Sequence, residues 1–354
     1  MKAVFLFLLP FYTIGQTNQA IDSLFNEHKN FSGILLVADH GKPIHYSAIG
    51  YRNFAKQIPL LKTDVFELAS VSKQFTSMII MMLKEKGKLR YNDLIEQYIS
   101  IPYKNITIRH LLTHTSGLPD YQAIMDAHWD KTKIAGNEDC IAYLNQYAPS
   151  VLFEPGARYE YSNTGYLLLA SIAEKVTGKN FIELCRQWIF NPLKMYNTNI
   201  RTLAEKKVTT NFAIGHIYVK EKNQFVRADS FPSSDYTIWL GNRKGPGRIS
   251  STVSDLLKWD QALYTNKLLK QTTLREAFEG FKLNDGKITN YGFGWMLPSD
   301  TGFGKTVYHT GDNPGYKTQI VRFIDKKKTI ILLSNNAYEN NDLLIESVLN
   351  VLLK

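Results

Sequence analysis

Cysteine is nearly absent from this sequence of 354 residues, in which only Cys140 and Cys185 occur. At most one disulfide can form, and no cluster of cysteines can hold a zinc ion. Internal repeats, low-complexity tracts and linkers rich in proline or serine are missing as well. We therefore expect one rigid body that is stabilised by its hydrophobic core, which a hydrophobic share of 44% can supply.

Long hydrophobic runs are also missing. The largely apolar stretch 3–12 is too short for the roughly 20 residues of a transmembrane helix. It follows Lys2 and precedes the small residues Thr13 and Gly15, an order typical of a secretory signal peptide. We expect residues 1–15 to be that signal and the remaining chain to be secreted into a bacterial periplasm. A buried N-terminal strand is the alternative interpretation.

Positive charge is in excess, but it is not concentrated. The 42 basic and 32 acidic residues give a net charge of +10 and are spread along the whole chain. No basic segment interleaved with aromatic residues occurs, so we expect no nucleic-acid partner. An anionic envelope surface is a sufficient partner for this charge.

Several catalytic and binding motifs are absent or incomplete. Gly-x-Ser-x-Gly does not occur, which argues against an α/β-hydrolase. His110 and His114 have the spacing of a helical metal pair, but no Glu follows His110 and no third ligand lies nearby, so we expect no metal. The segment 304–306 resembles the end of a phosphate-binding loop, yet Ser299 stands where the first Gly is needed. We expect no cofactor.

The pattern of apolar residues predicts strands at both ends of the chain. An N-terminal pair forms a hairpin, and three C-terminal strands precede an amphipathic helix. The expected strands are 33–38, 44–50, 306–308, 319–324 and 329–334, and the closing helix is 342–353. The two chain ends can therefore build one antiparallel sheet.

The middle of the chain is predicted to be mostly helical. The expected helices are 70–86, 93–99, 107–114, 164–177, 181–189 and 254–263. The fold class is then α/β: an antiparallel sheet from both chain ends, flanked by helices, with a mostly helical insertion. We expect residues 16–354 to form a single catalytic domain, with the α/β part at about 22–85 and 290–354, the helical part at about 86–289, and a cleft at their seam.

Ser70 and Lys73 form the only Ser-x-x-Lys in the sequence. On a helix, residues three apart share a face, so the Lys73 amine can lie beside the Ser70 hydroxyl. Burial and a helix N-terminus both favour the neutral amine, which can accept the serine proton. The alternative is that Ser70 only caps the helix and Lys73 points to solvent.

Tyr161-Ser162-Asn163 is one of six copies of Tyr-x-Asn, and its context selects it. It follows a turn at 154–156 and precedes a predicted helix, so it lies on a loop whose side chains can face a cleft. An ordinary connection between elements would have the same pattern.

His309-Thr310-Gly311 is the only match to Lys or His, then Ser or Thr, then Gly, and it is predicted to end a strand. A glycine at a strand edge lets a substrate backbone approach closely, and His309 can supply a proton or a positive charge near a carboxylate. A packed histidine at a strand end is the alternative.

Together these elements resemble the superfamily of serine β-lactamases and penicillin-recognising hydrolases, in the branch of class C β-lactamases and D-alanyl-D-alanine carboxypeptidases. The resemblance covers most of the mature chain. Beyond the three motifs it includes the segments 106–118, 153–165, 191–195, 247–255 and 291–295.

The resemblance implies a β-lactamase/transpeptidase-like fold and a role for each matching residue. Ser70 would be the nucleophile, Lys73 its activator and Tyr161 a partner in proton transfer. Asn163 would bind the amide side of the substrate, and the main-chain N–H groups of Ser70 and Asp312 would form an oxyanion hole. His309 and Thr310 of the His-Thr-Gly motif would meet a substrate carboxylate.

Class C β-lactamases carry Lys where this sequence has His309, which argues against efficient hydrolysis of antibiotics. We expect a secreted serine hydrolase that forms an acyl-serine intermediate with a small-molecule or peptide substrate containing an amide or ester. The alternatives are an esterase for small esters and a penicillin-binding or scaffolding protein without turnover.

Overall fold

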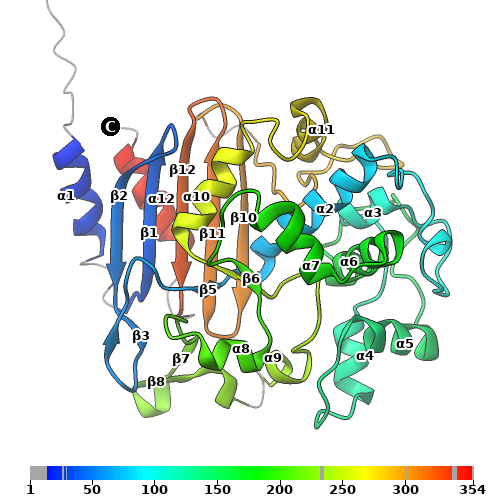
Figure 1. Cartoon of the computed structure of the whole chain (residues 1–354), viewed down its shortest axis with the longest axis horizontal. Coiled ribbons are helices and arrows are strands. Elements are labelled where there is room, and N and C mark those ends of the chain that lie inside the picture. The colour runs from blue at the N-terminus through cyan, green and yellow to red at the C-terminus, as the bar shows by residue number, and fades with distance from the viewer. Residues whose placement is uncertain are drawn as a thin grey trace, which may run out of the picture.

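The structure is a computed structural model that describes residues 14–25, 28, 30–231, 235–299, 302–336 and 341–352. Its main feature is a five-stranded antiparallel sheet in the order β10-β11-β12-β1-β2 (Figure 1). The strands are β1 (Gly33–Asp39), β2 (Lys42–Ile49), β10 (Thr306–Asn313), β11 (Tyr316–Phe323) and β12 (Lys328–Ser334). Gly33 pairs with Ser334, so the two ends of the chain meet in one sheet, as the sequence predicts.

Side chains on the strands alternate between two hydrophobic clusters, one on each face of the sheet. Leu35 and Val37 pack with α1 (Ile14–Leu24) and α12 (Asn341–Leu352) on one face. Their neighbours Ile34 and Leu36 belong to the larger cluster on the other face, which includes α10 (Val253–Ala262). The sheet is therefore covered on both faces.

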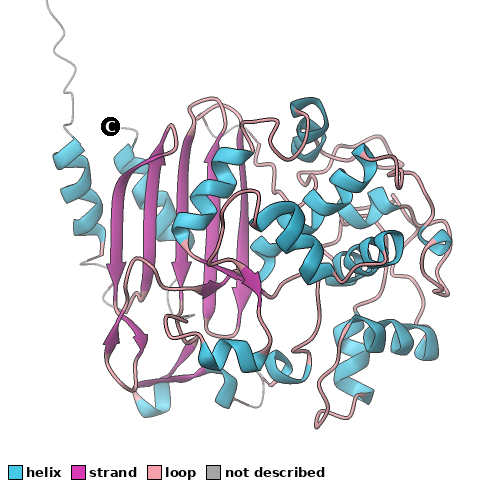
Figure 2. Ribbon diagram, viewed as in Figure 1, coloured by secondary structure: helices cyan, strands magenta, loops and turns pink. Residues whose placement is uncertain are grey.

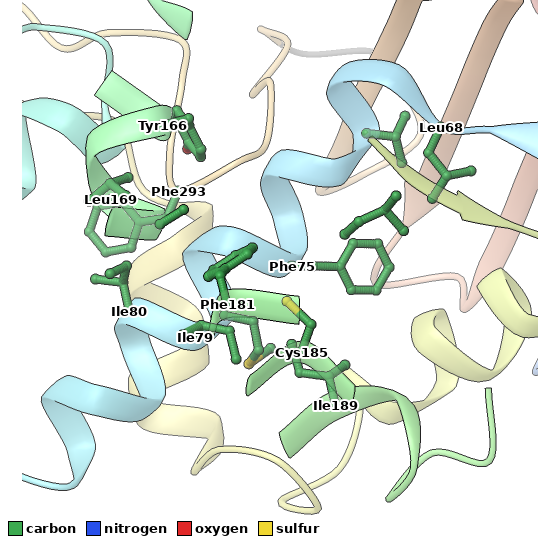
Figure 3. Close-up of a cluster of buried hydrophobic side chains, with 14 of the residues drawn as sticks. Leu68, Phe75, Ile79, Ile80, Tyr166, Leu169, Phe181, Cys185, Ile189 and Phe293 are labelled. Atoms are coloured by element: carbon green, nitrogen blue, oxygen red, sulfur yellow. The ribbon is translucent and has the colours of Figure 1, made fainter. Parts of the chain in front are cut away.

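The helical part lies beside the β10 edge of the sheet, as Figure 2 shows. At its centre is α2 (Lys73–Glu85), whose residues Lys73–Leu83 are all buried. Figure 3 shows Phe75, Ile79 and Ile80 of this helix among side chains from other elements. The surrounding helices are α3 (Ile108–Leu112), α4 (Tyr121–His128), α5 (Asn137–Tyr147), α6 (Asn163–Thr177), α7 (Phe181–Cys185) and α11 (Gln271–Arg275).

Short elements connect the sheet to the helical part. Two small strand pairs, β3 (Tyr51–Asn53) with β4 (Ile58–Pro59) and β7 (His216–Val219) with β8 (Gln224–Arg227), lie beyond one end of the main sheet (Figure 1). A third small sheet joins β5 (Phe66–Glu67), β9 (Ile249–Ser251) and β6 (Asn199–Ile200). The helices α8 (Leu203–Val208) and α9 (Tyr236–Trp239) lie close to these strands. This region borders the start of α2.

Several predicted elements have other bounds in the structure, and three of these differences have a clear physical reason. The segment predicted to be a helix at 93–99 contains only the 3-10 turn Ile95–Gln97. The helix predicted at 107–114 is the shorter α3, because Thr107 caps it at one end and His114 has a left-handed backbone with φ of 58° at the other. Strand β10 continues to Asn313, well beyond the expected end at residues 308–309, because residues 309–313 stay paired with β11.

The expected signal peptide falls almost entirely outside the described residues, and its last two positions, Ile14 and Gly15, begin α1. Among the described residues, none of the helices has the length and apolar character needed to cross a bilayer. Cys140 and Cys185 are both buried free thiols.

Candidate active site

Ser70 lies on a tight turn between β5 and α2. The 3-10 helix η1 (Ala69–Ser72) carries Ser70 and leads directly into α2. Ala69, just before Ser70, has a φ of 48°, a left-handed backbone conformation that residues other than glycine rarely adopt. Such local strain is held in place by surrounding packing and concentrates at functional sites. The turn presents the Ser70 hydroxyl at the junction of sheet and helical part.

Lys73 is completely buried and makes three close polar contacts. Its Nζ lies 3.1 Å from Ser70 Oγ, 2.8 Å from Asn163 Oδ1 and 2.9 Å from the carbonyl oxygen of Pro246. Burial lowers the pKa of Lys73 well below its ordinary value, and the charge of Arg243 lowers this pKa further. The prediction that Lys73 lies beside Ser70 is confirmed.

The three contacts suit a neutral amine. A neutral lysine has two N–H donors and one lone pair. The oxygens of Asn163 and Pro246 can only accept, so they take the two N–H groups. In the neutral form the lone pair is left for the remaining neighbour, the Ser70 hydroxyl, whereas a protonated Lys73 would donate to Ser70 Oγ across the same 3.1 Å contact. The geometry therefore prepares Lys73 to take the proton of Ser70.

The loop 161–163 approaches from the helical part and places two predicted residues against Lys73. The Tyr161 ring centre lies 4.7 Å from Lys73 Nζ. Burial raises the pKa of Tyr161 above its ordinary value, although hydrogen bonding with Ser70 lowers this pKa in part. Asn163 begins α6, and with its Oδ1 facing Lys73 its amide N–H₂ remains free, among the described residues, to meet a substrate oxygen.

His114 holds this loop in place. The Ser162 main-chain N–H donates to His114 Nδ1 over 3.1 Å, and the His114 ring packs 4.3 Å from the Tyr161 ring. Burial lowers the pKa of His114, and the nearby Lys73 adds to this effect. The spacing of His114 in the sequence points only to a metal ligand and gives no sign of this contact with the loop.

The edge strand β10 supplies the other wall of the site. The main-chain N–H of Tyr308 faces away from β11, because it donates to the carbonyl of Met296 over 3.1 Å. In an antiparallel pair this orientation repeats every second residue, so the N–H groups of Thr310 and Asp312 also point outward. The Ser70 N–H lies in the first turn of a helix, where no intrahelical acceptor exists. Two main-chain donors are thus available for an oxyanion.

Gly311 lets β10 approach the turn that carries Ser70. A Cβ at this position would lie 2.3 Å from the carbonyl oxygen of Leu68 and 2.2 Å from Thr318 Oγ1. Thr318 itself donates to that Leu68 carbonyl over 2.7 Å. Any side chain at position 311 would therefore displace the start of the nucleophile turn.

The sequence left His309 either as a proton donor or as a positive charge, and its surroundings in the structure suit a neutral ring. The residue is 1% exposed, and its Nδ1–H donates to the Thr310 carbonyl over 2.6 Å. In the neutral ring Nε2 then accepts from the Tyr291 hydroxyl over 2.8 Å. Burial, together with the charge of Lys73, lowers the pKa of His309 to about 3. A cation that meets a substrate carboxylate is therefore not present here near neutral pH.

Asp312 places its side chain away from the oxyanion donors. The side chain is 68% exposed and forms an ion pair with Lys317, which lies opposite it on β11. Lys317 offsets the negative charge, so the main-chain N–H of Asp312 remains suited to an anionic oxygen.

Sequence reasoning missed three groups that shape the site: the Pro246 carbonyl, the His114 ring and the Tyr291 hydroxyl. A main-chain carbonyl leaves no mark in a sequence. The one available signal was that Pro246 directly precedes the segment 247–255, which resembles the β-lactamase superfamily. Tyr291 lies in another such segment, 291–295. No cluster of three metal-ligating side chains occurs among the described residues, and His110 instead belongs to the cap of α3, where Thr107 N–H donates to its Nδ1.

Known proteins resemble this chain in sequence and in fold. Residues 17–352 match the family model described as Beta-lactamase. Penicillin-binding protein 4* of Bacillus subtilis is 38% identical over 320 residues, which cover 90% of this chain and 71% of the relative. The octameric penicillin-binding protein homologue from Pyrococcus abyssi has a similar structure, with a TM-score of 0.81 and 26% identity over 97% of this chain and 78% of that one.

A third similarity concerns the fold alone. EstCE1, described as a hydrolase with promiscuous acyltransferase activity, has a TM-score of 0.77 at 20% identity and covers 96% of this chain and 98% of its own. The matched segment of the family model contains all the candidate site residues, from Ser70 to Asp312.

Proposed function

The chain belongs to the Beta-lactamase family of hydrolases, and from that premise we propose that it cleaves amide or ester bonds through an acyl-Ser70 intermediate. The observation that carries the proposal is the set of contacts around Lys73. Two carbonyl-type oxygens occupy its N–H groups, which leaves its lone pair for the Ser70 hydroxyl.

In the first half of the reaction, Lys73 accepts the Ser70 proton while Oγ attacks the substrate carbonyl carbon. The carbonyl oxygen becomes negative and is held by the N–H groups of Ser70 and Asp312, each worth roughly 3 kcal/mol. The leaving group then takes this proton from Lys73, either directly or through the Tyr161 hydroxyl, which is reprotonated by Lys73; both side chains lie beside Ser70. Its departure leaves Ser70 acylated.

In the second half, water attacks the acyl carbon and passes a proton back to the same groups. Tyr161 has a pKa raised by burial, so it enters this step as a neutral phenol that relays the proton. The acid product leaves, Ser70 regains its hydrogen, and the cycle balances as hydrolysis of one bond by one water molecule.

A small-ester esterase is a second candidate, favoured by His309. Because this side chain is neutral and both its nitrogens are engaged, it offers no charge to a substrate carboxylate. Neutral esters need no such partner, whereas β-lactams and D-Ala-D-Ala peptides carry a carboxylate. A penicillin-binding protein that is acylated without turnover is the remaining alternative.

Ser70→Ala tests the proposal. The variant should lose covalent labelling by a fluorescent fluorophosphonate or penicillin, because no other serine hydroxyl is hydrogen-bonded to Lys73 in the described part of the chain. Ser254→Ala, which changes an exposed serine on α10, should label like the wild type. Equal labelling of the Ser70→Ala variant would overturn the assignment of the nucleophile.

The substrate class is resolved by a panel. Purified protein is assayed with a chromogenic cephalosporin, a D-Ala-D-Ala peptide and short-chain nitrophenyl esters. Turnover of esters alone supports the esterase, and labelling without turnover of any substrate supports the penicillin-binding alternative.

We further propose that the chain is exported to the periplasm. Support comes from residues 1–15, where Lys2 precedes an apolar run and small residues. The test is N-terminal sequencing of the protein recovered from cell fractions. Protein that stays in the cytoplasm with Met1 or Lys2 at its N-terminus would contradict export.

A further inference from the structure

A second cavity lies beside the active site, beyond the end of β10. Its volume is about 440 Å³, within the range of small-molecule sites. It is bordered by the β3 and β4 strands, α8, α9 and the residues that follow β10, which lie together in Figure 1. Asn313 and Pro314 line it and directly follow Asp312, the expected oxyanion donor. Glu67, three residues before Ser70, lines it as well.

The charge of this lining is strongly positive. Among its described residues are six cations and two carboxylates. The carboxylates are Glu67 and Asp229, and the cations are Arg52, Lys56, Lys206, Lys207, Arg227 and Arg248. The excess of positive charge faces a space large enough for part of a ligand.

Both carboxylates are already engaged by the protein. Asp229 accepts two hydrogen bonds from Arg227, at 3.0 and 2.6 Å. Glu67 accepts from Lys206 and from the Asn313 amide, and it lies 4.0 Å from Arg248. Burial alone would raise the pKa of Glu67, but Lys206, Arg248 and Arg243 lower it to about 2. These acids therefore leave part of the positive charge uncompensated.

Two lysines of this lining remain without an acidic partner among the described residues, and a third cation, Arg248, only shares Glu67 with Lys206. Lys56 and Lys207 are exposed, and no ion pair is found for either among the described residues. Arg248 is 1% exposed, and its Nε–H is buried with no acceptor in the described part of the chain. Its backbone is also left-handed, with φ of 79°, so surrounding structure holds it in a costly conformation.

The direction of the substrate follows from the catalytic groups. The leaving group needs a proton, so it faces Tyr161 and Lys73 on the side of the helical part. The acyl chain then extends the other way, along β10 past Asp312. That path leads to the cavity edge at Asn313. When the ligand and its site carry opposite charges, the site discriminates between ligands and the association rate is higher.

We propose that this cavity is a subsite for a carboxylate on the acyl side of the substrate, which Lys56, Lys207 and Arg248 recognise. The inference rests on the proposed acyl-Ser70 chemistry and adds the substrate class to it. The acyl donor that fits best carries its carboxylate a few bonds beyond the carbonyl that Ser70 attacks. An extended adipoyl chain separates its two carboxyl carbons by roughly 6 Å, from standard bond lengths.

The test compares two esters that differ in one charge: mono-4-nitrophenyl adipate and 4-nitrophenyl hexanoate. The ratio of their kcat/KM values, adipate over hexanoate, should exceed one in the wild type and fall with added salt. It should drop about tenfold in the double variant Lys56→Gln/Lys207→Gln. The control Lys88→Gln/Lys175→Gln removes the same charge from exposed sites elsewhere and should keep the wild-type ratio.

A wild-type ratio at or below one, or an equal fall in both double variants, would overturn the subsite. Loss of hexanoate hydrolysis in Ser70→Ala checks the proposed function separately, because it does not depend on the cavity. Should neither ester turn over, calorimetric titration of Ser70→Ala with adipic acid monoamide and hexanamide, which differ only in the distal carboxylate, still decides. The monoamide should bind more tightly, and Lys56→Gln/Lys207→Gln should weaken it about tenfold, whereas equal binding of both amides would refute the subsite.

Discussion

Lys73 and His309 illustrate how burial sets the chemistry of single residues. Both side chains are buried. In water at neutral pH, a lysine is a cation and a histidine is a mixture of the neutral and protonated forms. Their surroundings provide acceptors and donors that suit the neutral forms, and burial lowers the pKa of each. Neutral Lys73 can act as a base. Neutral His309 cannot, because both its ring nitrogens are hydrogen-bonded, one of them to the Tyr291 hydroxyl.

Lys73→Arg separates a neutral base from a simple positive charge. Arginine keeps the charge but does not lose its proton in proteins, so the variant cannot accept the proton of Ser70. We expect kcat/KM for an ester to fall by at least about 10²-fold. Lys84→Arg on the same helix is the control and should retain activity, since its partner Glu276 can pair with either side chain. Substantial activity of Lys73→Arg would show that Lys73 acts only through its charge.

The pH dependence of substrate choice tests the state of His309. Because its pKa lies at about 3, His309 stays neutral between pH 5.5 and 7.5, and its charge cannot change in that window. Two kcat/KM values are compared: one for a substrate with a carboxylate on the leaving group, such as a D-Ala-D-Ala peptide, and one for a neutral ester. Their ratio should therefore not change with pH in this window. A ratio that falls as the pH rises through about 6.5 would restore the cationic role that the sequence suggested.

The sequence predicts residues whose side-chain type and spacing indicate their role. It does not predict residues whose role depends on neighbours that only the fold brings together. Ser70 and Lys73 were found because a helix fixes their separation. The neutral state of His309 could not be found, since it depends on Tyr291, which is 18 residues away in the chain and adjacent only in the fold. The Pro246 carbonyl was missed because every residue has such a group.

At the scale of elements, β10 combines catalysis with packing. Its inner residues pair with β11, its outward N–H groups face the site, and it contacts the turn η1. The segment Thr310-Gly311-Asp312-Asn313 contains residues typical of turns, which is why the strand was expected to end earlier. Pairing with a neighbouring strand outweighs that local preference.

Gly311→Ala tests the close approach of β10 to η1. The new Cβ would lie 2.3 Å from the Leu68 carbonyl, which belongs to the backbone and cannot move alone. We expect the turn to shift and kcat/KM to fall by about 10²-fold, because misplacement by about 1 Å has this effect on catalytic groups. Gly247→Ala is the matched control, since its Cβ would meet Ala69 at an ordinary 3.7 Å. Similar activity in both variants would show that the approach is not critical.

At the scale of the whole molecule, buried neutral histidines connect stability to pH. Burial lowers the pKa of five of the eight histidines: His45, His110, His114, His216 and His309. Their native pKa values lie below the ordinary 6.5, so the unfolded chain binds protons first as the pH falls. The contribution of these histidines to stability is therefore complete above about pH 6.5 and is lost progressively as the pH falls toward their native pKa values.

The expected loss can be measured by urea unfolding at pH 7 and pH 5. At pH 5 a buried histidine with a native pKa of about 4, such as His216, lowers the free energy of unfolding by about 2 kcal/mol. His216→Phe should reduce the difference between the two pH values by that amount, whereas His40→Asn at an exposed position should not. Equal stability of the wild type at pH 5 and pH 7 would refute the neutral state of these histidines.

The sheet built from both chain ends also sets the order in which the site can form during folding. Strand β1 has the C-terminal strand β12 as one of its two neighbours, and β10 is joined to β1 through β11 and β12 while it also contacts the Ser70 turn. Until these strands have paired, the Ser70 turn lacks the strand that completes the oxyanion hole. Pairing across such a long stretch of sequence is slow and comes late in folding. A chain whose C-terminal strands have not yet paired is consequently unable to acylate itself on esters, although it already contains Ser70 and Lys73.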